Sequence, residues 1–285
     1  MTKLLITRPL PDMVVDAAKA VFDVTVRADT TPLTEAERAT ALSEYDAVLP
    51  TLGDIFAADA FAAKPRCRIL ANFGVGFNHI DAGAARAVDV EVTNTPGAVT
   101  DATADIAMTL MLMTCRRAGE GERMLRAGKW PGWHPTQAFG TACQRQDIGR
   151  GLPFEATQLD RLTDVMATAD VVVLAVPASP QTHHLIDADA LAAMSPDSYL
   201  INIARGDVVD ETALISALKN NQIAGAGLDV YEFEPQVPEA LCAMENVTLL
   251  PHLGTSAQEV REQMGMMAVD NLIAFFDGKP VPNPV

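Results

Sequence analysis

The sequence predicts an α/β fold with two doubly wound parallel sheets, each in a lobe of its own. Short apolar runs alternate with helical stretches from residue 3 onward, a pattern typical of parallel strands joined by helices. The alternation stops near residue 126, where a loop-like stretch over 128–151 contains two tryptophans, and then it resumes. We therefore expect one sheet before this stretch and a second sheet after it.

In the first half, Thr34 and Glu37 form a capping-box pattern, which predicts a helix that begins there and runs to about Glu44. The other helices are expected at Asp12–Val21, Ile55–Ala63 and Ile80–Val88, and the strands at Lys3–Thr7, Phe22–Arg27, Asp46–Pro50, Cys67–Phe73 and Glu91–Thr93. One long helix over Asp101–Arg126 is expected to link the lobes.

In the second half, Asp170–Val176 reads as an apolar strand, as a strand buried on both faces of a parallel sheet should. Further strands are expected at Ser198–Ile203, Gly225–Val230 and Val247–Leu250, and helices at Thr157–Thr168, Asp189–Met194, Glu211–Asn220 and Ser256–Phe276.

Charge and composition narrow the range of functions. The 285 residues carry a formal charge of −16, which argues against nucleic acid and anionic membrane as partners, because both need a basic surface. The longest apolar run, Val171–Pro177, is too short to span a membrane. The four scattered cysteines are expected to be reduced thiols of a cytoplasmic protein, with no disulfide and no metal site: Cys67, Cys115, Cys143 and Cys242.

Three polar residues follow the ends of expected strands in the second half: Arg205, Glu234 and His252. Ligands bind at the carboxyl ends of strands in open α/β sheets, so these side chains could converge on one cleft. Arginine offers a planar fork to a carboxylate, and histidine can donate a proton to a carbonyl oxygen near neutral pH. A glutamate beside the histidine would orient the imidazole and keep it charged. Taken singly, each residue could equally be a surface or turn residue.

Several motifs resemble the D-isomer specific 2-hydroxyacid dehydrogenases, in particular their glyoxylate/hydroxypyruvate reductase branch. The resemblance covers almost the whole chain, and the spacings of 29 residues from Arg205 to Glu234 and 18 from Glu234 to His252 agree with it. The matching stretches are Asn72–Asp81, Asn94–Asp105, Gly128–His134, Ile201–Asp210, Gly225–Pro235, Leu250–Gly254 and Met264–Phe276.

The resemblance implies two Rossmann-like domains with a cleft between them. Residues 1–97 and 260–285 would form a flavodoxin-like substrate domain, and residues 98–259 a nucleotide-binding domain. It also implies an enzyme that reduces a small 2-oxo acid, glyoxylate or hydroxypyruvate, to the D-2-hydroxy acid with NADH or NADPH. A homodimer is the implied assembly.

The same resemblance implies roles for individual residues. Arg205 would bind the substrate carboxylate, His252 would be the acid in reduction, and Glu234 would tune His252. The amides of Val75 and Gly76 would also hold the carboxylate, and Trp133 would contribute to substrate choice in a neighbouring subunit. The cofactor would contact Thr103, Pro177, Ile203, Ala204, Asp229, His252, Gly254 and Arg150.

The sequence departs from the family at the dinucleotide fingerprint. No G-x-G-x-x-G occurs: Gly74-x-Gly76, Gly149-x-Gly151 and Gly225-x-Gly227 each lack the third glycine. Only 29 residues separate Gly140 from Asp170, so roughly forty residues of a first strand–helix–strand unit are missing against the usual length of the family. Either the chain is a deletion form, or residues are omitted from this stretch, and we favour omission because both flanking halves match the family.

This departure leaves two questions open. The alternative to an enzyme is a non-catalytic scaffold or sensor that keeps the fold but has lost cofactor binding. NADPH is weakly favoured over NADH, because Arg150 lies near the position that would meet a 2′-phosphate, although it reads equally well as a solvated loop residue. The other histidines lack a partner pattern, and we expect His183 and His184 in a loop rather than on a metal.

Overall fold

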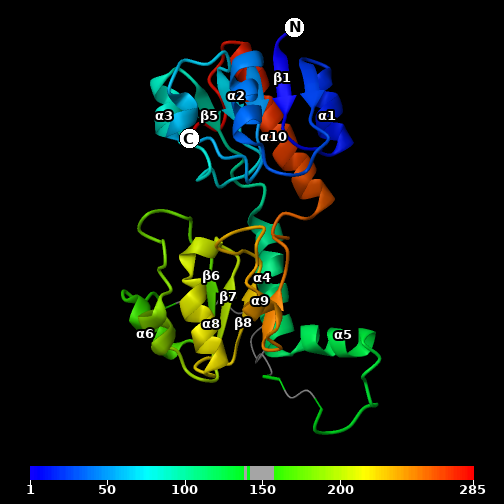
Figure 1. Ribbon diagram of the computed structural model, residues 1–285, viewed down its shortest axis with the longest axis vertical. Helices are drawn as coiled ribbons and strands as arrows, with labels where there is room; N and C mark the ends of the chain where they lie inside the picture. The colour runs from blue at the N-terminus through cyan, green and yellow to red at the C-terminus, as the bar shows by residue number, and fades with distance from the viewer. Residues whose placement is uncertain (138–139, 142–156) are drawn as a thin grey trace. The chain divides into compact units, whose positions relative to one another are not determined.

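The computed structural model describes residues 1–137, 140–141 and 157–285. The chain divides into two compact units. Unit 1 comprises Met1–Ala102 and Thr255–Val285, and unit 2 comprises Thr103–Gly254 (Figure 1). Each unit has a parallel sheet of its own, as the interrupted alternation in the sequence predicts.

Unit 1 contains a five-stranded sheet in the order β2-β1-β3-β4-β5, with all strands parallel. This is the flavodoxin-like strand order, in which the chain reverses direction beside the first strand. The strands are β1 (Lys3–Ile6), β2 (Asp23–Val26), β3 (Ala47–Leu49), β4 (Ile69–Ala71) and β5 (Glu91–Thr93).

Both faces of this sheet are covered by helices. Successive side chains of a strand point to opposite faces, so Leu4 and Ile6 join one apolar cluster while Leu5 joins the other. The cluster of Leu4 and Ile6 includes residues from α1 (Asp12–Lys19) and α10 (Gln258–Phe276). The second cluster includes residues from α2 (Glu35–Glu44) and α3 (Ala82–Ala87) (Figure 1). The predicted capping box of Thr34 and Glu37 is confirmed at the start of α2.

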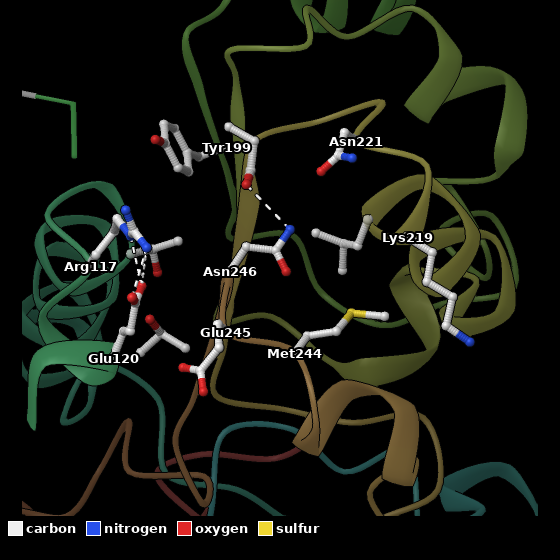
Figure 2. Close-up of a pocket in the computed structure, with 12 residues that line it drawn as sticks. Arg117, Glu120, Tyr199, Lys219, Asn221, Met244, Glu245 and Asn246 are labelled. Atoms are coloured by element: carbon white, nitrogen blue, oxygen red, sulfur yellow. Dashed lines mark hydrogen bonds and ion pairs between the residues drawn. The ribbon is translucent and has the colours of Figure 1, made fainter. Parts of the chain in front are cut away.

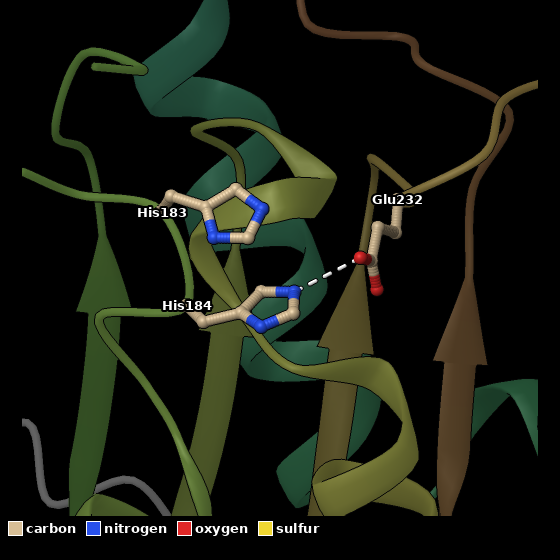
Figure 3. A group of neighbouring side chains, drawn as sticks. All are labelled: His183, His184 and Glu232. Carbon is tan, nitrogen blue, oxygen red and sulfur yellow. Dashed lines mark hydrogen bonds and ion pairs between the residues drawn. The ribbon is translucent and has the colours of Figure 1, made fainter. Parts of the chain in front are cut away.

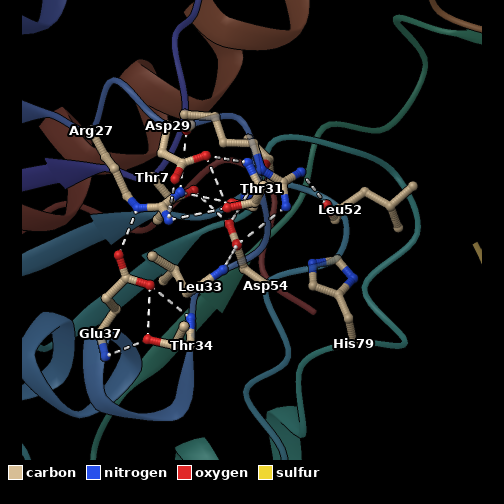
Figure 4. A network of polar contacts seen from close by, with 12 residues as sticks. Thr7, Arg27, Asp29, Thr31, Leu33, Thr34, Glu37, Leu52, Asp54 and His79 are labelled. Carbon is tan, nitrogen blue, oxygen red and sulfur yellow. Dashed lines mark hydrogen bonds and ion pairs between the residues drawn. The ribbon is translucent and has the colours of Figure 1, made fainter. Parts of the chain in front are cut away.

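A polar network organises the loops beyond the carboxyl ends of β1 and β3 (Figure 4). The carboxylate of Asp54 is fully buried and accepts hydrogen bonds from the Thr7 hydroxyl at 2.5 Å and from the amides of Leu33 and Thr51, each at 3.0 Å. Arg8 contacts the same carboxylate at 3.5 Å. A buried carboxylate is stable only when it is bonded in this way, so the network fixes these loops.

Unit 2 contains a four-stranded parallel sheet in the order β6-β7-β8-β9. The strands are β6 (Val171–Leu174), β7 (Tyr199–Asn202), β8 (Gly225–Leu228) and β9 (Val247–Leu249). The helices are α4 (Thr100–Cys115), α5 (Ala118–Arg126), α6 (Leu162–Thr168), α7 (Ala188–Ala192), α8 (Glu211–Lys219) and α9 (Glu239–Cys242). Short 3-10 turns occur at Ala58–Phe61 (η1) in unit 1 and Gly206–Val208 (η2) in unit 2.

β6 is an edge strand among the described residues. Val173 in its middle is 42% exposed. The prediction that Asp170–Val176 is buried on both faces was therefore wrong for one face. If residues are omitted, a break in the chain is expected between Gly140 and Asp170, most of all over Thr141–Glu155, and residues 142–156 lie outside the described part.

Three predicted helices differ in the structure. The single helix expected over Asp101–Arg126 is two helices, because Arg117 adopts a left-handed conformation with φ of 53° and breaks the hydrogen-bond ladder between α4 and α5. The helix expected at Ile55–Ala63 is only the turn η1. The helix expected at Thr157–Thr168 begins five residues later, at Leu162.

No helix among the described residues is both long enough and apolar enough to cross a membrane. The three cysteines within the described part carry free thiols: Cys67, Cys115 and Cys242.

Candidate active site

Arg205 follows β7 on a turn that is held by the last residue of the strand. The Asn202 side chain is buried, accepts from the amide of Ala204 at 3.0 Å and donates to the carbonyl of Arg205 at 2.9 Å. The Arg205 guanidinium donates to the Ala204 carbonyl at 2.7 Å. Asn202 is a positioning residue that the sequence analysis missed, although a polar residue at the end of an apolar strand is a visible signal.

The turn of Arg205 lies against the loop that follows β8. A Cβ atom added to Gly206 would meet the carbonyl carbon of Tyr231 at 1.8 Å, so the backbones approach too closely for any side chain. This contact brings the segment of Arg205 next to the segment that carries Glu234. Glycine is therefore required at position 206.

His252 follows β9, and Asp229 holds its turn. The amide of His252 donates to the carbonyl of Asp229 at 2.9 Å. The two carboxylate oxygens of Asp229 accept from the amides of Leu253 at 2.7 Å and Gly254 at 2.8 Å. His252 itself has a φ of 53°, a conformation that costs energy in a non-glycine residue and is held here by these contacts.

Glu234 and His252 form a direct pair. Nδ1 of His252 lies 2.9 Å from Oε2 of Glu234, while Oε1 accepts from the Tyr231 amide at 3.0 Å. Burial alone would raise the pKa of Glu234, but the His252 hydrogen bond and charge, with the Tyr231 amide and Arg205, bring that pKa below its ordinary value. Glu234 is therefore ionised at neutral pH and faces the imidazole as a charge.

Two further side chains of this region are perturbed by burial. Desolvation lowers the pKa of Arg205, against the attraction of Glu234 and Asp207. Desolvation also raises the pKa of Glu211, against the hydrogen bond from the amide of Glu232. A partly buried arginine that remains a cation is a strong site for a carboxylate, since the surrounding water is already displaced.

The other expected cofactor contacts lie at the same end of the unit 2 sheet. Thr103 donates to the Gly254 carbonyl at 3.3 Å, so it adjoins the turn of His252. The Pro177 carbonyl accepts from the Thr182 hydroxyl at 2.8 Å in the loop after β6, and the Ile203 amide donates to Leu174 at 3.3 Å. Ala204 is buried beside Asn202. Arg150 lies outside the described residues.

In the expected substrate loop of unit 1, asparagine side chains bind the backbone carbonyls. Asn72 donates to the carbonyls of Gly74 and Gly76 at 3.0 Å each, and Asn94 donates to that of Val75 at 2.9 Å. The amides of Val75 and Gly76 find no acceptor among the described residues. Backbone amides presented in this way suit an anion. Their contact with a substrate stays a prediction.

Trp133 is 80% exposed, and its predicted role in substrate choice stays a prediction. A pocket of about 470 Å³ occurs elsewhere in unit 2, lined among others by Thr114, Tyr199 and Asn246 (Figure 2). Tyr199 begins β7 and Asn246 precedes β9, so this pocket lies at the amino ends of the strands. Arg205 and His252 lie at the carboxyl ends, so the pocket is separate from their site.

The strand ends of unit 2 therefore carry a histidine–glutamate pair with an arginine near it, in an α/β protein of two units. Residues 151–254 match the family described as D-isomer specific 2-hydroxyacid dehydrogenase, NAD binding domain. A glyoxylate reductase from Thermococcus onnurineus is 35% identical over 99% of this chain and 95% of its own length. The chain belongs to the D-isomer specific 2-hydroxyacid dehydrogenase family, in its glyoxylate/hydroxypyruvate reductase branch.

Solved structures agree with this membership. The TT0316 protein from Thermus thermophilus is 33% identical, with a TM-score of 0.89 over 99% of both chains. An NADPH-dependent glyoxylate/hydroxypyruvate reductase from Sinorhizobium meliloti, in complex with NADP and malonate, is 31% identical, with a TM-score of 0.81 over 100% of this chain and 96% of its own.

The comparison with the Thermococcus relative also contains gaps in this chain. It extends over 318 aligned positions, whereas this chain has 285 residues, so at least 33 positions (318 minus 285) have no residue here. This agrees in size with the segment that the sequence analysis finds missing.

The described residues fit the nicotinamide end of a cofactor. A Cβ atom on Gly254 would lie 3.5 Å from both the Asp229 carboxylate and the Thr103 hydroxyl, so polar groups gather beside His252. The helices α7 and α8 are capped by the carboxylates of Asp187 and Asp210, which would repel a phosphate at these two N-termini.

Proposed function

We propose that this chain reduces the 2-oxo group of glyoxylate or hydroxypyruvate to the D-2-hydroxy acid, with a nicotinamide cofactor. The observation that carries the proposal is the 2.9 Å contact between His252 and an ionised Glu234, with Arg205 on the neighbouring strand end. An acid and a carboxylate-binding cation at one edge of the sheet are the two groups that this reduction requires from the protein.

Arg205 binds the carboxylate of the substrate and polarises its carbonyl. Its guanidinium is partly buried, and the Asn202 hydrogen bonds hold its backbone, so the side chain loses little freedom when the substrate binds. In unit 1, the backbone amides of Val75 and Gly76 are proposed as substrate-binding donors.

His252 supplies the proton to the carbonyl oxygen. Because Nδ1 faces Glu234, Nε2 is the nitrogen that remains for the substrate. Glu234 stabilises the protonated ring before the transfer and fixes its orientation. The cofactor, when bound, supplies the hydride that goes to the carbonyl carbon. In the oxidation direction Nε2 accepts the proton instead.

The finer assignments are also proposals. NADPH is the favoured cofactor, supported by the NADPH-dependent reductase from Sinorhizobium meliloti and by the position of Arg150 in the sequence. A cytoplasmic homodimer is proposed as well, in which Trp133, 80% exposed, would reach a neighbouring subunit.

A second function rests on the missing dinucleotide fingerprint. A chain without the phosphate turn can keep this fold as a scaffold or sensor and no longer bind the cofactor. The preserved contacts of Arg205, Asp229, Glu234 and His252 support the enzyme over the scaffold, because a scaffold has no need of an ionised Glu234 beside His252.

Steady-state rates with glyoxylate and hydroxypyruvate test the proposal directly. The wild-type protein should oxidise NADPH in the presence of either substrate, and His252→Ala should abolish most of this activity while the fold persists by circular dichroism. His134→Ala is the matched control, because His134 is exposed and its side chain hydrogen-bonds only Thr136 among the described residues. Equal rates for His252→Ala and wild type would refute the proposal.

A further inference from the structure

Three potential metal ligands meet beside the segment that carries Arg205. The rings of His183 and His184 are stacked, with centroids 4.0 Å apart and an angle of 26° between their planes. Nε2 of His184 lies 2.9 Å from Oε1 of Glu232, and one ligand atom from each of the three residues lies within 4.8 Å of the other two. Figure 3 shows the two rings one above the other, with Glu232 opposite them.

The backbone places both histidines on the same side. Adjacent side chains in an extended chain point in opposite directions, but His184 has a φ of 49°, a left-handed conformation that turns its ring beside that of His183. The His184 amide donates to the Asp207 carbonyl at 2.8 Å, which holds this turn in place. Sequence analysis could not find this cluster, because Glu232 is 48 positions away.

The third residue, Glu232, is also held. Its amide donates to the Glu211 carboxylate at 3.0 Å, and its side chain is only 14% exposed. Two further carboxyl groups lie close by, because the charges of Glu232 and Glu234 add to the burial that raises the pKa of Glu211. A group of carboxylates with two imidazoles favours a divalent cation over an anion or a neutral ligand.

We propose that His183, His184 and Glu232 bind one divalent transition-metal ion, of which Zn²⁺ is the type that this ligand set suits best. Ligands at about 2.0–2.2 Å from a tetrahedral zinc lie about 3.3 Å from one another. His184 and Glu232 are already close to that separation. His183 must move by roughly 1.5 Å at most, and it can do so because it is exposed.

The site is distinct from the acid–base pair, which uses Glu234 and His252. It joins the loop after β6, which contains Pro177, to the loop after β8, which contains Glu234. Metal binding to a folded site adds its free energy to folding. The ion would therefore clamp these loops in a unit whose strand β6 is an edge among the described residues.

Calorimetric titration of the chelator-treated, full-length protein with ZnCl₂ tests the proposal. Wild type should bind one equivalent with micromolar or tighter affinity, and Zn²⁺ should raise its Tm. His183→Ala and Glu232→Gln should each weaken binding by more than about tenfold, and the matched control His134→Ala should not. His183 and His134 are both exposed, so neither alanine should disturb folding.

Cobalt(II) gives a second readout of the same ligands. Co²⁺ bound by wild type should show the intense visible bands of a low-symmetry four-coordinate site, and these should be absent in His183→Ala. Three results would overturn the proposal: no Zn²⁺ uptake by wild type at micromolar concentrations, unchanged affinity in His183→Ala, or a loss of binding in His252→Ala instead of His183→Ala.

Discussion

Replacing Glu234 by glutamine tests whether its charge acts on His252. Glu234 uses one oxygen for the Tyr231 amide at 3.0 Å and the other for His252 at 2.9 Å. Glutamine has only one acceptor oxygen, so one of these two donors must lose its partner in addition to the loss of charge. A charge-assisted hydrogen bond exceeds a neutral one by about 1–2 kcal/mol, and the pair is about 30% exposed, which argues for the lower part of that range.

We therefore expect Glu234→Gln to lower kcat/KM for glyoxylate by roughly 5–30-fold. Initial rates with glyoxylate measure this effect. Glu239→Gln is a matched control, since Glu239 is an exposed residue in the same region of the chain. A kcat/KM within twofold of wild type would refute the role of Glu234.

Four further predictions follow from the site. Arg205→Ala should lower kcat/KM by about 30–1,000-fold, because a charged hydrogen bond to the substrate is worth about 2–4 kcal/mol, and rates within twofold of wild type would contradict this. Asp229→Ala should reduce the free energy of unfolding in urea by about 2 kcal/mol, because two backbone amides lose their acceptor. Gly206→Ala should prevent stable folding or strongly lower Tm, whereas Gly121→Ala, with open space around its Cβ, should change stability by no more than about 1 kcal/mol. Burial raises the pKa of Glu211, so the folded state binds the proton of this carboxyl group more tightly than the unfolded state. Glu211→Gln should therefore raise the free energy of unfolding in urea at neutral pH, and this gain should shrink at lower pH. A gain that grew on acidification would contradict this.

The periodic and capping signals in the sequence predicted most of the fold. Alternation in β1 places Leu5 on one face and Leu4 on the other, and Thr34 with Glu37 marks the start of α2. The break at Arg117 was missed, because a left-handed conformation at a residue other than glycine leaves no local signature. The helix expected at Ile55–Ala63 was too long, because the apolar residues around η1 resemble one face of an α-helix.

The sequence predicted the charged side chains of the candidate site, but not the hydrogen bonds that hold their loops in place. Arg205, Glu234 and His252 were visible because they follow strand ends. The two amides bound by Asp229, and the turn held by Asn202, depend on loops that meet only in the folded chain. For the same reason, the sequence does not reveal that Glu232 lies beside His183 and His184.

Cofactor binding is the measurement that tests the central claim most directly. Purified, folded protein should be titrated with NADPH and with NADH, followed by cofactor fluorescence, and then assayed for turnover of glyoxylate. The account predicts saturable binding of a reduced nicotinamide cofactor, tighter for NADPH, together with turnover. A site with a binding free energy of only about −4 kcal/mol would be half filled at about millimolar cofactor. If neither cofactor bound at that concentration, the result would contradict the account and favour the scaffold.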